Sequence, residues 1–174
     1  VSRDRFLVKM MYILLLKRLE SSWFSFHTTV NKILQHHQNV LAKIENYQKY
    51  KSTETLSQTS LFTDDDDEDL QEYTIGKREI KLSDIDNAGN LALFEKSLKR
   101  DISKLKGLSK GMDYFSEVIA QELEEDEPLK SRDTKLQELI AILNDKKENA
   151  TNKKVIIFTT YTDTAQYLFE QLSA

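Results

Sequence analysis

The feature that most constrains the fold is the scarcity of residues that interrupt helices. The chain of 174 residues contains four Gly and one Pro, and the stretch from Arg3 to Lys51 contains neither. Gly and Pro destabilise helix interiors by about 1 and 3 kcal/mol relative to Ala, and folds rich in strands need many turn residues. The sequence therefore predicts a mainly α fold with long antiparallel helices.

Residues 1–51 are predicted to form the first long helical segment. Their apolar side chains recur at spacings of three and four, which is typical of an amphipathic helix. Ser21 and Ser22 interrupt this pattern because serine hydroxyls compete for backbone hydrogen bonds. The segment is therefore either one long helix or two helices that meet near Ser22. The apolar positions are Leu7, Met10, Met11, Leu14, Leu15, Phe26, Val30, Ile33, Leu41, Ile44 and Tyr47.

Residues 52–88 are predicted to form an acidic flexible loop. Ser, Thr and Gln dominate up to Thr63, and the run 64–69 is acidic throughout. Such a run repels itself and buries little apolar surface. With Glu72 it contributes seven negative charges, so the rest of the chain has a net charge of +3 although the whole chain has −4.

Residues 89–128 are predicted to form a second helical segment, after a boundary at Gly89-Asn90. Apolar residues step by three or four from Leu91 to Ile119, with Lys and Arg on the other faces. Gly107 and Gly111 are expected to weaken or divide this helix. Pro128 cannot continue it.

Residues 129–174 have the pattern of one unit of an α/β sheet. Asp133 precedes a predicted helix. The run Val155–Thr160 is β-branched and apolar on both faces, which is typical of a central strand in a parallel sheet. Thr162 and Asp163 are suited to be the N-cap and the first-turn acid of a final helix. The expected fold class is thus mainly α with one terminal β-strand–helix unit from an incomplete α/β domain.

The sequence contains none of the common catalytic or metal-binding patterns. It has no Cys, hence no thiolate nucleophile, and no Gly-Lys-Ser/Thr phosphate loop. His27, His36 and His37 lack the i,i+4 spacing of paired metal ligands. No catalytic, cofactor-binding or metal residue is therefore predicted. The apolar run 10–16 is also too short for a membrane span, so no membrane contact is expected.

Three segments resemble Swi/Snf-type superfamily 2 helicases of the bacterial RapA-like kind. Residues 153–168, Lys-Lys-Val-Ile-Ile-Phe-Thr-Thr-Tyr-Thr-Asp-Thr-Ala-Gln-Tyr-Leu, resemble the motif IV strand and helix that open the second RecA-like lobe. Residues 133–139 resemble the helix before that strand, with the shape Asp-x-Lys-x-x-x-Leu. Residues 14–22, Leu-Leu-Leu-Lys-Arg-Leu-Glu-Ser-Ser, are similar to a segment between the two lobes.

This resemblance implies that the chain is an internal piece of a nucleic-acid-dependent ATPase and is itself non-catalytic. The parent protein would bind ATP and Mg²⁺, act on nucleic acid, in particular double-stranded DNA, and lie in the cytoplasm. Residues 129–174 would begin its C-terminal lobe. The turn Thr159, Thr160, Tyr161 and Thr162 is expected to contact the nucleic-acid backbone, because helix N-termini and threonine hydroxyls donate to phosphates.

A second hypothesis is a helical protein-interaction or scaffold module with no enzymatic role. The sequence that flanks this chain in its gene would discriminate the two, because an ATPase needs a Gly-Lys-Thr loop and an Asp-Glu box upstream. The unpaired strand is also expected to make the isolated chain prone to artificial dimerisation.

Overall fold

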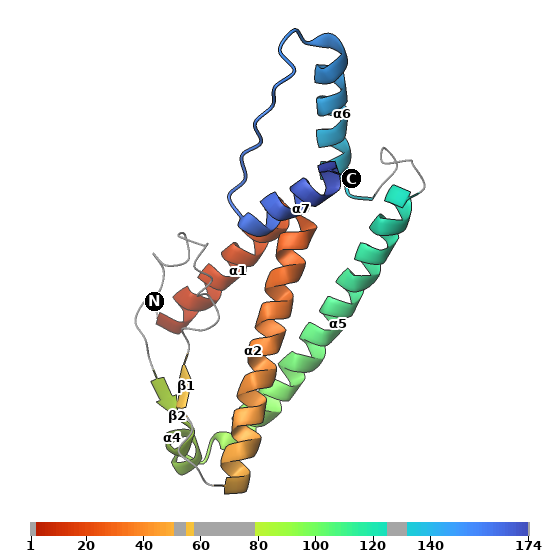
Figure 1. The fold of residues 1–174 in the computed structure, drawn as a ribbon. Coiled ribbons are helices and arrows are strands. Elements are labelled where there is room, and N and C mark those ends of the chain that lie inside the picture. The colour runs from red at the N-terminus through yellow and green to blue at the C-terminus, as the bar shows by residue number, and fades with distance from the viewer. Residues whose placement is uncertain (1–2, 51–54, 58–78, 125–131, 174) are drawn as a thin grey trace. The chain divides into compact units, whose positions relative to one another are not determined.

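The computed structural model describes residues 3–50, 55–57, 79–124 and 132–173, and in them the chain is mainly α-helical, as predicted (Figure 1). No helix within these ranges is long and apolar enough to cross a membrane. The acidic run 64–69 lies outside the described residues. The elements in chain order are α1 (Arg3–Ser21), α2 (Trp23–Tyr50), β1 (Thr55–Ser57), β2 (Glu79–Lys81), α4 (Leu82–Asn87), α5 (Leu91–Glu124), α6 (Thr134–Asn149) and α7 (Thr162–Ser173).

The first helical segment consists of two helices that meet at Ser22. The Ser22 N–H donates to the Arg18 carbonyl oxygen at 3.0 Å, so Ser22 closes the last turn of α1. Its hydroxyl accepts a hydrogen bond from the Ser25 N–H at 3.0 Å. A serine side chain that accepts from an N–H three residues later is an N-cap. One residue therefore ends α1 and begins α2.

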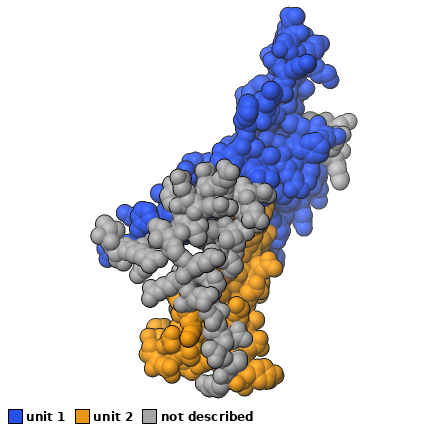
Figure 2. Space-filling view, turned by 60° about the vertical axis from the view of Figure 1, so that its left-hand side comes forward, with its two compact units in different colours: residues 1–27, 110–174 blue, residues 28–109 orange. Residues whose placement is uncertain are grey.

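The chain divides into two compact units (Figure 2), and α2 and α5 each contribute residues to both. Unit 1 comprises residues 1–27 and 110–174, and unit 2 comprises residues 28–109. The predicted boundaries at 52, 89 and 129 thus follow changes in the chain's composition and do not coincide with these units.

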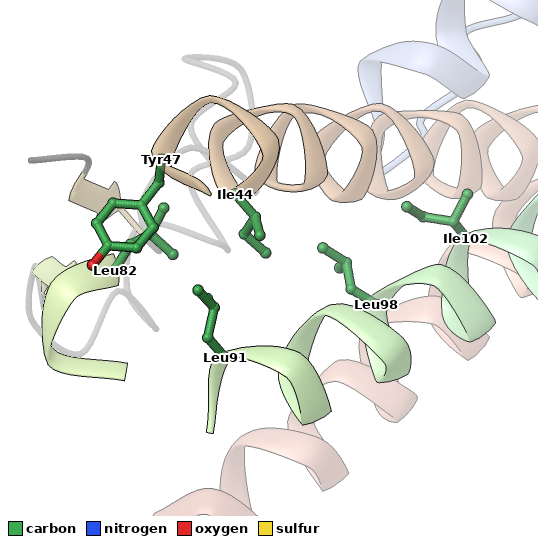
Figure 3. Close-up of a cluster of buried hydrophobic side chains, with 6 residues drawn as sticks. All are labelled: Ile44, Tyr47, Leu82, Leu91, Leu98 and Ile102. Atoms are coloured by element: carbon green, nitrogen blue, oxygen red, sulfur yellow. The ribbon is translucent and has the colours of Figure 1, made fainter. Parts of the chain in front are cut away.

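In unit 2, the α2 and α5 portions lie antiparallel. Gln48 donates to Glu95 at 2.8 Å near one end, and Ser109 donates to Asn31 at 2.6 Å near the other. These helices share a buried apolar core (Figure 3), to which α4 contributes Leu82 with no exposed surface. The buried members of this core are Ile44, Tyr47, Leu82, Leu91, Leu98 and Ile102.

Unit 2 also contains structure within the predicted loop 52–88. β1 and β2 pair antiparallel, with Leu56 opposite Ile80, and α4 follows directly. The turn after α4 explains the boundary predicted at Gly89-Asn90: Gly89 has φ of 71°, its N–H donates to Asp86, and the Asn90 N–H donates to Ile85. These two bonds form a Schellman motif, which favours glycine because it needs positive φ.

Two local expectations differ from the structure. α5 runs unbroken through Gly107 and Gly111, so these glycines do not divide the helix, and their weakening of it stays a prediction. The run Val155–Thr160, predicted to be a strand, belongs to an irregular segment between α6 and α7 (Figure 1). A strand requires a neighbour with which to share hydrogen bonds, and no described residue pairs with this run.

Candidate functional site

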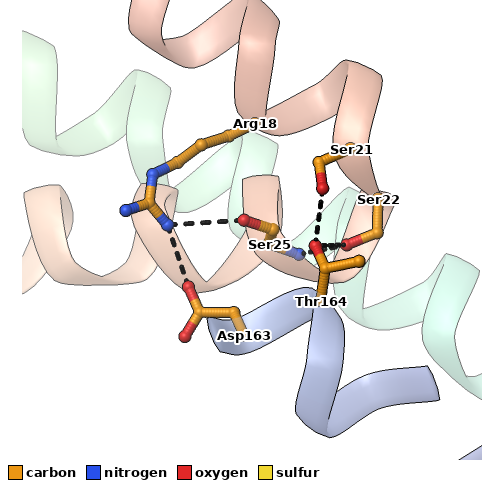
Figure 4. Close-up of polar contacts among 6 residues, drawn as sticks. All are labelled: Arg18, Ser21, Ser22, Ser25, Asp163 and Thr164. Atoms are coloured by element: carbon orange, nitrogen blue, oxygen red, sulfur yellow. Dashed lines mark hydrogen bonds and ion pairs between the residues drawn. The ribbon is translucent and has the colours of Figure 1, made fainter. Parts of the chain in front are cut away.

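The candidate site lies entirely in unit 1, where the start of α7 meets the junction of α1 and α2. We name the six residues drawn in Figure 4 the elbow cluster: Arg18, Ser21, Ser22, Ser25, Asp163 and Thr164. The hydroxyl of Thr164, which is 4% exposed, bonds to the hydroxyls of Ser21 at 2.8 Å and Ser22 at 2.9 Å. The serine pair that bends the chain therefore also holds α7.

Arg18 provides the charged contact of the elbow cluster. Its guanidinium donates to the Asp163 carboxylate at 2.9 Å and to the Ser25 hydroxyl at 3.3 Å. The same group lies 4.7 Å from the centroid of the Tyr161 ring, within the range of a cation–π contact. Arg18 is 7% exposed, and a buried guanidinium needs such partners because an unpaired buried charge is strongly destabilising.

A second group, the Trp23–Asp133–Tyr167 triad, joins α2, α6 and α7. One oxygen of Asp133 accepts from the Tyr167 hydroxyl at 2.6 Å and from the Trp23 indole N–H at 3.0 Å. Its other oxygen accepts from the Leu136 N–H at 3.0 Å, so Asp133, which was predicted to precede a helix, is also the N-cap of α6. Burial, followed by the hydrogen bond to Asp133, raises the pKa of Tyr167 well above its usual value.

Aromatic packing surrounds this triad. The rings of Trp23 and Tyr167 meet edge to face with centroids 5.6 Å apart, and Phe24 stacks on Tyr167 at 5.4 Å. Trp23 also meets Phe115 of α5 edge to face at 5.5 Å. Aromatic pairs in these geometries stabilise by about 0.5–1.5 kcal/mol beyond their buried area. The triad is therefore held from several helices.

An open pocket of about 330 Å³ lies beside the triad and the elbow cluster. Most of its lining is apolar, and the rest is polar. Its lining residues are Leu19, Ser21, Ser22, Trp23, Phe115, Arg132, Asp133, Thr134, Lys135, Leu136, Leu139, Thr164, Tyr167 and Leu168.

The polar groups of this arrangement bond to one another across helices. The Asp133 oxygens accept from Trp23, Leu136 and Tyr167, and the Arg18 guanidinium donates to Ser25 and Asp163, so these groups hold helices together. Among the described residues no group of three or more His, Asp or Glu side chains is placed to hold a metal ion. The site positions α7, and through α7 it positions the turn that precedes it.

The four residues predicted to contact nucleic acid lie at that turn, in two different environments. Thr160 and Thr162 are exposed and Thr159 is half-buried. Tyr161 is 6% exposed and contacts Arg18, so its ring is engaged inside unit 1. Asp163 lies in the first turn of α7, as predicted. The N-cap position belongs to Tyr161, whose carbonyl accepts from the Ala165 N–H at 3.1 Å, and not to Thr162.

Sequence reasoning missed most of the elbow cluster. It identified Ser22 as a break and Asp133 as a helix start from local patterns. Arg18 and Asp163 are 145 positions apart, and no local pattern indicates such a pair. The one signal in the sequence was the arginine at position 18 within a run rich in leucine, which needs an acidic partner when it is buried.

Comparisons of the chain with family models, with curated proteins and with solved structures found no match in any of the three.

Proposed function

We propose that this chain is part of a nucleic-acid-dependent ATPase of the Swi/Snf type, in which unit 1 fixes the start of the second RecA-like lobe against the helices between the lobes. ATP hydrolysis in the parent protein would drive movement on, or remodelling of, nucleic acid. The chain contains no Gly-Lys-Ser/Thr loop, so the proposal assigns ATP and Mg²⁺ binding to other parts of the same protein.

One observation carries the proposal: the three segments that resemble the family contact one another. Residues 14–22 reach residues 153–168 through the bonds of Arg18 to Asp163 and of Ser22 to Thr164. Residues 133–139 reach the same helix through the bond of Asp133 to Tyr167. Segments of one functional module are expected to be adjacent in space even when a long insert separates them in sequence.

The exposed run 155–158 gives further support. Ile156 is 78% exposed and Phe158 is 91% exposed, and the side chains of Val155 and Ile157 are also exposed. A chain segment that is apolar on both faces is typical of a central strand in a parallel sheet with helices on both sides. The proposal therefore assigns the neighbouring strands to the rest of the second lobe.

In this proposal the elbow cluster sets the position of the phosphate-binding turn. Arg18 and Thr164 hold the first turn of α7, and the exposed Thr160 and Thr162 lie at its start. A helix N-terminus carries unpaired N–H groups and a positive dipole end, which attract phosphate. Backbone contacts of this kind position a protein on nucleic acid and carry no sequence information.

The test is the double substitution Thr159→Ala with Thr160→Ala in the protein expressed from the whole gene. The proposal expects lower nucleic-acid-stimulated ATP hydrolysis with unchanged basal hydrolysis, because only the phosphate contact is removed. Thr151→Ala is the matched control, since Thr151 is an exposed threonine in the same connecting segment. Equal stimulation in the double variant, the control and the wild type would refute the contact.

The alternative function, a helical interaction module, is favoured by an exposed apolar stripe on α1. Val8 is 69%, Tyr12 64% and Leu19 45% exposed, and with Leu16 they follow the i, i+4, i+8, i+11 spacing of one helix face. Such a stripe can bury itself against a partner helix. Under this alternative, Tyr12→Lys would abolish a protein complex of the whole protein, and its ATP hydrolysis would be absent or insensitive to nucleic acid.

A further inference from the structure

A basic face runs along α5 in unit 2, outside the segments that resemble the helicase family. Five exposed cationic residues lie between positions 96 and 106: Lys96, Lys99, Arg100, Lys104 and Lys106. At about 100° of rotation per residue they occupy an arc of about 160°. The buried Leu98 and Ile102 lie on the opposite side of the same helix. The core contact therefore turns the five cations toward solvent.

Only part of this charge is neutralised within the protein. Lys99 bonds to Glu95 at 2.5 Å, and Arg100 lies 3.4 Å from Asp101. Lys96, Lys104 and Lys106 form no ion pair with any residue that the structure describes. A local positive face thus exists on a chain whose net charge is −4.

The side chains on this face of α5 indicate whether its partner is a protein surface or an array of phosphates. Between Lys96 and Lys106 the uncharged position within this arc is Ser103, and the exposed Leu93 lies on the same side one turn earlier. A Cβ added at Gly107 would lie in open space, with no other described part of the chain within 4 Å. Protein–protein interfaces are built around apolar and aromatic anchors and are depleted in lysine. Lysine binds phosphate as a flexible point charge. The face therefore suits a regular array of phosphates better than a protein surface.

We propose that this face of α5 binds the phosphate backbone of duplex nucleic acid, as a contact separate from the turn at residues 159–162. Positions 96–106 span about 15 Å of helix, and that length of duplex axis carries about nine phosphate charges. Contacts of lysine with phosphate give affinity without sequence preference. This contact rests on the proposed function and gives the same nucleic acid a second binding surface on the chain.

The experiment measures the salt dependence of duplex binding by this chain. Binding of a fluorescein-labelled duplex of about 20 bp is followed by anisotropy between about 50 and 200 mM salt. The variant K96Q/K104Q/K106Q removes the three lysines without a described partner. The control K9Q/K49Q/K147Q makes the same change of charge at exposed lysines on α1, α2 and α6. Circular dichroism verifies that both variants remain folded.

Each phosphate contact adds about 0.9 to the slope of log K against log salt, so removing one contact removes about a 3.5-fold salt effect over this range. The wild type is therefore expected to lose about 40-fold more affinity across the range than K96Q/K104Q/K106Q does. The control should keep the wild-type slope. Equal slopes for the two variants, or no duplex binding at low salt, would overturn the proposal.

Binding of polyglutamate of matched charge, measured beside the duplex, tests whether the partner is nucleic acid or an acidic protein. Binding of polyglutamate as tightly as the duplex would assign the face to acidic proteins and overturn the proposal. The proposed function is tested separately, by nucleic-acid-stimulated ATP hydrolysis of the variant with Thr159→Ala and Thr160→Ala. Loss of duplex binding through α5 and loss of the proposed function therefore give different results.

Discussion

We expect the two partners of the ion pair in the elbow cluster to differ in how much their removal lowers the free energy of unfolding. Arg18→Met deletes the guanidinium and leaves Asp163, whose side chain is 24% exposed and which lies in the first turn of α7. Water and the helix dipole, the latter by about 0.3–1 kcal/mol, still stabilise that carboxylate. Asp163→Asn leaves a guanidinium whose side chain is only 9% exposed. The second change should therefore be the more damaging one.

The magnitudes follow from the interactions that each substitution removes. Arg18→Met removes a hydrogen bond between charged groups, about 1.5–3 kcal/mol, and the cation–π interaction with Tyr161, about 0.5–2 kcal/mol. Methionine recovers part of the packing, so we expect a decrease of about 2–4 kcal/mol in the free energy of unfolding. Asp163→Asn should cost about 3–5 kcal/mol, the usual range when a buried pair is left with one partner.

The assay is urea denaturation followed by tryptophan fluorescence. Trp23 is the sole tryptophan and belongs to unit 1, so its emission reports the unit that contains the cluster. The double variant R18M/D163N should be less destabilised than the sum of the single variants by about 1–3 kcal/mol. A change below about 0.5 kcal/mol for Arg18→Met, or strict additivity, would refute the reasoning, because surface substitutions alone give changes of that size.

Three further predictions concern single side chains. Tyr167→Phe should cost about 1.5–3 kcal/mol by urea titration of Trp23 emission, since Asp133 loses a donor. Alkaline difference absorbance should lose one tyrosine whose ionisation is displaced to high pH, and an unchanged titration would contradict the raised pKa of Tyr167. Leu82→Ala should cost about 2–5 kcal/mol through a cavity in unit 2, visible by circular dichroism; no loss would exclude Leu82 from the core. Burial, then the charges of His37 and Lys43, lower the pKa of His36 from 6.5. The unfolded chain therefore binds the extra proton more readily, stability falls as pH drops through about 6.5, and His36→Gln should flatten that dependence; an equal slope in the variant would argue against it.

The parts of the fold that could be predicted are those encoded by neighbouring residues. Ser22 marked a break because its hydroxyl competes for backbone donors, and it caps α2. Asp133 marked a helix start, and it caps α6. Gly89 marked a boundary, and its positive φ closes the turn. Each prediction depends on interactions within about five residues, which sequence patterns describe well.

The parts that could not be predicted depend on distant partners. The bond of Arg18 to Asp163 joins positions 145 apart, and nothing near either residue identifies the other. The run Val155–Thr160 was predicted as a strand from its β-branched composition, but composition cannot provide the neighbour that a strand needs. The Tyr161 ring packs beneath Arg18 of α1, a contact that no neighbouring residue indicates, and its expected contact with nucleic acid stays a prediction.

We propose that this chain belongs to an ATPase that responds to nucleic acid. The most direct measurement is ATP turnover with and without duplex DNA by the protein expressed from the whole gene, beside this 174-residue chain alone. We expect turnover that duplex DNA stimulates in the whole protein, and none in the chain alone, which lacks a phosphate-binding loop. Turnover by the chain alone, or turnover by the whole protein that is absent or insensitive to nucleic acid, would contradict it.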